Sequence, residues 1–99
     1  MIAKVHKRED GTILVAVCDT ELLGTRVEEG ANQLDLTGDF YKGDERSEEE
    51  VGDLLRNADC INVVGAKSVA LALKEELIEK THVLVVAGVP HAEAVLVHD

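Results

Sequence analysis

Aromatic residues are nearly absent from this 99-residue chain, which has one phenylalanine, one tyrosine and no tryptophan. A core without large rings must be built from Val, Leu, Ile and Ala, which suits a β sheet covered by helices. Hydrophobic residues still make up 45% of the chain, too many for a disordered protein. A chain of this length is expected to form a single domain over residues 1–99.

Long hydrophobic runs are also missing. No apolar stretch approaches the roughly 18 residues that a membrane-spanning helix needs. Charge appears as early as Lys4, so the chain does not begin with the apolar segment of a secretory signal. We therefore expect a soluble cytoplasmic protein with no membrane partner.

Cysteine is scarce, and the two that occur, Cys18 and Cys60, lie in apolar segments typical of strands. Because cysteine is among the most buried residue types, we expect two reduced, packed thiols. A disulfide, a metal pair or a nucleophile are the alternatives. Asp19 next to Cys18 argues against a nucleophile, since a neighbouring carboxylate raises the pKa of a thiol.

Basic residues are outnumbered by acidic ones, 10 against 20, which gives a formal net charge of −10. Phosphate binding needs a basic surface, so this balance argues against direct nucleic-acid binding. The acidic residues are concentrated in one segment: Asp44, Glu45, Glu48, Glu49, Glu50 and Asp53. This segment predicts a solvated helix face, and the alternative is a docking surface for a basic protein partner.

Four segments in the first 40 residues are typical of strands: 2–7, 13–18, 26–28 and 34–36. The Asp10-Gly11 pair between the first two predicts a tight hairpin turn. Asp19 is expected to cap a short helical turn that stops at Gly24.

The second half of the chain predicts two helices and three strands. Ser47 and Glu50 form a capping box that begins the first helix. The remaining elements are a strand at 60–64, a helix at 67–77, a strand at 83–87 and a last strand at 94–97. The strand–helix–strand unit from Cys60 to Ala87 predicts a parallel crossover. Together these elements predict an α+β two-layer sandwich, a mixed sheet with two helices on one face and one β-α-β crossover.

The segment Gly65-Ala66-Lys67-Ser68 resembles the end of a phosphate-binding P-loop, but Ala66 separates Gly65 from Lys67 and breaks the motif. An anion site formed by the helix start with Lys67 and Ser68 stays open. The alternative is structural: Ser68 or a nearby group caps the helix, and Gly65 makes the turn.

A second candidate segment, Gly88-Val89-Pro90-His91, holds the only proline and predicts a loop between strands, with Pro90 in a cis bond or a rigid turn. Parallel neighbouring strands would bring Gly65 and Gly88 to the same end of the sheet. The predicted ligand or partner surface is Asn62, Gly65, Lys67, Ser68, Gly88, Pro90 and His91. The histidine spacings match no metal motif, so neither a metal nor a cofactor is expected.

Several segments carry a family resemblance: Ala16-Val17-Cys18-Asp19, Glu21-Leu22-Leu23-Gly24, Glu29-Gly30, Phe40-Tyr41 with Gly43, Asn62 to Gly65 with Ser68-Val69, and Gly88 to Ala92. Together they span nearly the whole chain, which resembles a small archaeal family catalogued as domain of unknown function 424. Glu93 and Ala66 stand where that family usually has a glutamine and an acidic residue. The resemblance implies an archaeal cytoplasmic protein and no particular reaction.

Because no complete catalytic motif is present, we expect a small non-catalytic binding or interaction domain. One alternative is an accessory protein linked to translation or RNA. Another is a small enzyme that uses the anion site at Gly65 with His91 as the acid–base group. A homodimer is a further option, because the apolar segment 94–97 would need cover at a sheet edge.

Overall fold

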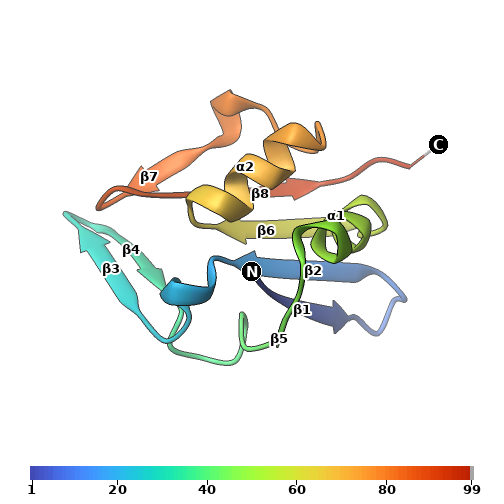
Figure 1. Ribbon diagram of the computed structural model, residues 1–99, viewed down its shortest axis with the longest axis horizontal. Coiled ribbons are helices and arrows are strands. Elements are labelled where there is room, and N and C mark those ends of the chain that lie inside the picture. Colours follow the sequence, from blue (N-terminus) through green and yellow to red (C-terminus); the bar gives the residue numbers. More distant parts are fainter. Residues whose placement is uncertain (99) are drawn as a thin grey trace.

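The computed structural model describes residues 1–98, which form a six-stranded mixed sheet with two helices on one face (Figure 1). The strands of this sheet are β1 (Ile2–Lys7), β2 (Ile13–Cys18), β5 (Asp44–Glu45), β6 (Cys60–Val64), β7 (Leu84–Val86) and β8 (Val89–Val95). The helices are α1 (Glu48–Arg56) and α2 (Ala66–Lys74). The predicted α+β sandwich is confirmed.

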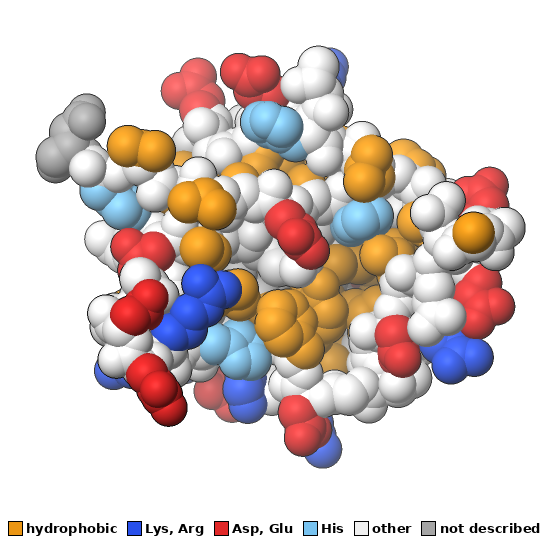
Figure 2. All heavy atoms as spheres, turned by 180° about the vertical axis from the view of Figure 1, so that it is seen from behind, with side chains coloured by type: hydrophobic (Ala, Val, Ile, Leu, Met, Phe, Trp, Pro, Cys, Tyr) orange, Lys and Arg blue, Asp and Glu red, His pale blue; other side chains and the backbone are white. Residues whose placement is uncertain are grey.

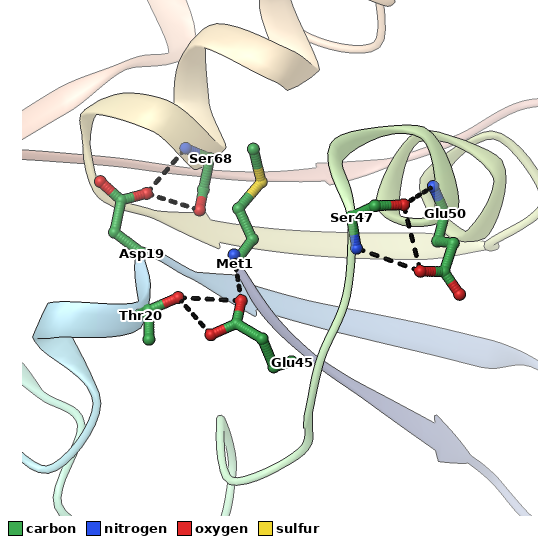
Figure 3. A network of polar contacts seen from close by, with 7 residues as sticks. All are labelled: Met1, Asp19, Thr20, Glu45, Ser47, Glu50 and Ser68. Atoms are coloured by element: carbon green, nitrogen blue, oxygen red, sulfur yellow. Dashed lines mark hydrogen bonds and ion pairs between the residues drawn. The ribbon is translucent and has the colours of Figure 1, made fainter.

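Smaller elements complete the fold. Strands β3 (Arg26–Glu29) and β4 (Asn32–Asp35) pair with each other in a separate two-stranded sheet. Short 3₁₀ turns, η1 and η2, lie at Thr20–Leu22 and Lys80–His82. The N-terminal ammonium of Met1 pairs with the Glu45 carboxylate at 2.6 Å, and the Thr20 hydroxyl donates to the same carboxylate at 2.8 Å (Figure 3).

The strand order of the main sheet is β5-β1-β2-β6-β8-β7. Only β2 and β6 are parallel neighbours, and all other adjacent pairs are antiparallel. Strands β6 and β7 run parallel with α2 between them in sequence, as a crossover requires. They are not neighbours, however, because β8 lies between them. The expectation that these two strands pair directly is wrong.

Strand β8 begins at Val89, five residues before the predicted last strand. The cause is a two-residue turn at Ala87 and Gly88, whose φ angles are +49° and +80°. Two successive positive φ values are the geometry that closes a tight hairpin, so the chain returns at once along β7. Pro90 and His91 therefore lie in a strand and not in a loop. The strand at this edge of the sheet is β7 and not the C-terminal strand, and Leu84 and Val85 of β7 are largely exposed.

Pro90 is tolerated inside the sheet because its lack of an N–H leaves no carbonyl group without a donor. It lies opposite Gly65, whose N–H donates to the Pro90 carbonyl at 2.8 Å. The Gly65 carbonyl, which would accept from a residue at Pro90's position, accepts instead from Val69 N–H at 2.9 Å in the first turn of α2. No cis peptide bond occurs in residues 1–98.

The sheet has two differently covered faces. On one face, α1 and α2 bury an apolar core that includes Val15, Leu55 and Val63. On the other face, the chain between β2 and β5 covers only part of the sheet, where Leu36 and Tyr41 are buried against Ala16. The remaining part, over β6 and β8, stays accessible to solvent and is called the open face below (Figure 2).

Helix α1 begins as the sequence predicts. Ser47 Oγ accepts from Glu50 N–H at 3.2 Å, and Ser47 N–H donates to Glu50 Oε1 at 3.1 Å, which completes the capping box (Figure 3). These bonds from the backbone and hydroxyl of Ser47, together with Arg46, lower the pKa of Glu50 below its ordinary value of 4.5.

A Glu50→Gln variant is expected to change how stability depends on pH. The lowered pKa means that the Glu50 carboxylate stabilises the fold fully above about pH 4.5, and that this contribution is lost as the pH falls through the folded-state pKa. Urea unfolding of both proteins should show that the wild type is more stable than the variant at pH 7. The difference in free energy of unfolding between the two proteins should be smaller at pH 3. An equal difference at both pH values would contradict this cap.

Candidate functional site

The start of α2 is capped by a carboxylate from a distant strand. Asp19, directly after β2, is 4% exposed, and its Oδ1 accepts from the backbone N–H and the hydroxyl of Ser68, both at 2.8 Å (Figure 3). Its Oδ2 accepts from Lys67 N–H at 3.1 Å. Because β2 and β6 are parallel neighbours, the ends of both strands meet here. The parallel register thus brings Asp19 to the helix.

Gly65 makes this close approach possible. Its φ is +109°, and a Cβ built there would lie 2.3 Å from the Asp19 side-chain carboxyl carbon. Any other residue would therefore combine an unfavourable backbone conformation with a collision. Glycine at this position is explained by the buried cap, without any ligand.

The predicted anion site is consequently filled by the protein itself. The N–H groups of Lys67 and Ser68 already donate to Asp19, and an added phosphate would meet that carboxylate. The expectation that Asp19 caps its own helical turn is wrong, because its side chain makes no capping bond to η1. Ser68 is fully buried and faces Asp19 rather than solvent.

The two predicted loop segments do adjoin, through the bond between Gly65 N–H and the Pro90 carbonyl. Gly88 lies two residues before Pro90, in the hairpin turn. The sheet nevertheless divides the predicted residues. Lys67 and Ser68 belong to α2, which lies on the helical face of the sheet. Side chains alternate along β6, so Asn62 lies on the same face as Val64, opposite the helices, whereas Val63 faces them. His91 pairs with Val64 and lies on the same face as Asn62.

A polar chain crosses the middle of the open face. The Tyr41 hydroxyl donates to Asn62 Oδ1, and Asn62 Nδ2 donates to Glu93 Oε1 at 3.0 Å. Asn62 lies opposite Glu93 in the antiparallel β6–β8 pair. Burial, and after it the negative charge of Glu93, raises the pKa of Tyr41 well above its ordinary value of 10.0. Tyr41 therefore stays protonated at neutral pH and keeps donating to Asn62.

A hollow of about 530 Å³ opens over this part of the sheet. Its lining residues are Arg8, Leu14, Phe40, Cys60, Ile61, Asn62, Glu93, Ala94 and Val95. Phe40 and Val95 are 40% and 78% exposed. The Phe40 ring stacks on His6 with centroids 4.8 Å apart. Figure 2 shows hydrophobic side chains gathered in the middle of this face, with histidines beside them.

Sequence reasoning found Asn62 but missed its partners on this face. Arg8 adjoins the predicted Asp10-Gly11 turn, and no helix or strand is predicted at Phe40. The predicted last strand, 94–97, begins after Glu93, whereas β8 contains this residue. The alternation of His91, Glu93 and Val95 with Ala92 and Ala94 was the available signal, because such alternation predicts a strand with one exposed face.

The two cysteines are expected to react at very different rates with a thiol reagent such as iodoacetamide. Cys18 is fully buried, and burial together with Asp19 raises the pKa of its thiol to about 11. Cys60 is only partly buried, on the open face, where the Arg8 guanidinium donates to its Sγ at 3.7 Å. Mass spectrometry of the native protein at pH 8 should show label on Cys60 alone, and urea should expose both thiols. Equal labelling in the native state would contradict the burial of Cys18.

Neither cysteine forms a disulfide in the described residues. Over residues 1–98, no group of three or more His, Cys, Asp or Glu side chains is arranged to hold a metal ion. Neither α1 nor α2, nor any other helix in that range, has the length and hydrophobicity to cross a membrane.

Comparison with known proteins gives a family and a fold. Residues 6–97 match the family model described as protein of unknown function (DUF424). The chain belongs to the DUF424 family. The expected family is thus confirmed. No curated protein matches this DUF424 chain in sequence.

A crystal structure of an uncharacterized conserved protein from Methanopyrus kandleri is similar to this DUF424 protein, with a TM-score of 0.78 and 20% sequence identity. The match covers 99% of this chain and 93% of the other. At this identity the likeness shows a shared fold.

Proposed function

We propose that this DUF424 protein is a non-catalytic binding domain and that its binding surface is the open face of the main sheet. The observation that carries the proposal is the exposed hollow whose lining includes Phe40 and Val95 together with the hydrogen-bonded Asn62–Glu93 pair. Exposed apolar side chains with a few fixed polar groups among them are typical of surfaces that bind another molecule. Asn62 was predicted as a contact residue, and His91 lies on the same strand face.

The small-enzyme alternative loses its main support. It needed an anion site at the start of α2, and those N–H groups bind Asp19. His91 lies on the other side of the sheet from Lys67 and Ser68.

Docking of a basic protein on the acidic face of α1 is also less favoured. Glu50 and Asp53 already form ion pairs with Arg46 and Arg56. Their charge is therefore partly neutralised within the chain, which leaves less attraction for a partner.

A photo-crosslinking amino acid tests the proposal whatever the identity of the partner. It is placed at Val95 on the open face or, as a matched control, at Val5, an exposed valine on the face that α1 covers. In extract of the source organism we expect adducts from position 95 and few from position 5. Added unlabelled wild-type protein should suppress them, whereas a Phe40→Asp variant should not. Adducts from position 5 alone would contradict the proposal.

A further inference from the structure

We propose that the partner bound by the open face is a second copy of this chain, related by two-fold symmetry. This inference rests on the proposed function, because it names the occupant of the same surface.

The hollow is lined by one cation and one anion that do not pair with each other. Arg8 and Glu93 both contribute to its wall, and both are exposed. Neither forms an ion pair with any group in residues 1–98. The recorded side-chain contacts are Arg8 with Cys60 Sγ and Glu93 with Asn62 Nδ2. Each charge is thus available to a group from outside the chain.

A surface with one unpaired charge of each sign is complementary to itself. In a two-fold interface, a contact between residue i of one copy and residue j of the other occurs twice, with the roles exchanged. Arg8 of each copy would then meet Glu93 of the second copy, on either side of contacts between apolar side chains. Phe40 and Val95 supply the apolar area, and their burial provides the main driving force.

Part of the negative charge of the chain lies away from this interface. The run of acidic residues at Glu48, Glu49 and Glu50 begins α1, on the other face of the sheet. Two copies that meet through their open faces keep these carboxylates apart by more than the thickness of the sheets. Physiological salt screens charges over about 8 Å, so their repulsion is weak at that separation.

Exchange of the two charges tests the inference. We expect sedimentation velocity to show wild-type dimers, and Arg8→Glu and Glu93→Arg each to weaken the dimer at least tenfold, because every pair at the interface becomes repulsive. An equimolar mixture of the two variants restores opposite charges in both pairs, so it should dimerise again. Lys80→Glu and Glu49→Arg make the same changes in net charge at exposed positions elsewhere and should leave the dimer intact.

Circular dichroism of each variant shows whether it is folded, and recovery in the mixture cannot be produced by unfolded chains. A wild type that stays monomeric up to about 1 mM, or variants whose mixture does not recover, would overturn the inference. If the wild type is monomeric while position 95 crosslinks to another protein, the inference fails and the proposed function stands. If the wild type is monomeric and no adduct forms, both fail.

Discussion

Replacing Asp19 by alanine should lower the free energy of unfolding by about 3 kcal/mol. The substitution leaves the N–H groups of Lys67 and Ser68 and the Ser68 hydroxyl without their acceptor. Ser68 is fully buried, so water cannot readily replace the carboxylate. Helix α2 also loses a negative charge at its positive end. Urea unfolding at pH 7, followed by circular dichroism, measures the loss.

Two further variants separate the cap from a general effect of mutation. Asp19→Asn keeps one acceptor oxygen but turns amide hydrogens toward a donor, so an intermediate loss is expected. Asp39→Ala removes an exposed carboxylate that makes no side-chain hydrogen bond or ion pair within residues 1–98, and it should change stability by less than about 0.5 kcal/mol. An Asp19→Ala protein as stable as Asp39→Ala would contradict the cap.

A Gly65→Ala substitution is expected to be similarly damaging, with a loss of about 3 kcal/mol. The added Cβ would lie 2.3 Å from the Asp19 carboxyl carbon, and the backbone would hold alanine at a φ of +109°. Gly38→Ala is the matched control, because nothing lies within 4 Å of its Cβ and its φ is not positive. A loss equal to that of the control would contradict the geometry at Gly65.

The two substitutions are also expected to be coupled. In an Asp19→Ala background the carboxyl group that collides with Cβ is absent, so Gly65→Ala should cost only the backbone strain, about 1 kcal/mol. A double-mutant cycle would therefore show an interaction energy of at least about 1 kcal/mol. Strict additivity would mean that Gly65 and Asp19 act independently.

The sequence predicted the elements whose signals are local. The Asp10-Gly11 hairpin and the capping box of Ser47 and Glu50 depend on residues only a few positions apart. The start of β8 does not follow from the local sequence, because proline ordinarily interrupts a strand inside a sheet. The missing N–H of Pro90 is harmless only beside Gly65, whose carbonyl accepts from Val69. That contact depends on the tertiary structure.

The candidate site was predictable only in part for the same reason. Asn62 was found as a polar residue in an apolar strand, but its bonds reach Tyr41 and Glu93, 21 and 31 residues away. The cap on α2 joins Asp19 to Ser68 across 49 residues. In the sequence, the start of a helix suggests an anion site whether or not a carboxylate of the protein already occupies it. The parallel pairing of β2 with β6 is what brings the Asp19 carboxylate to the start of α2.

Backbone amide NMR spectra of the wild-type protein over a dilution series test most directly whether the open face is where this protein binds. Signals of Asn62, Glu93 and Val95 should shift progressively with protein concentration, while those of Glu48–Arg56 in α1 stay fixed. The Glu93→Arg variant should show no shifts over the same range. Concentration-dependent shifts in α1 would contradict binding through the open face. So would a wild-type protein that shows no shifts at all and also gives no crosslinked adduct from position 95.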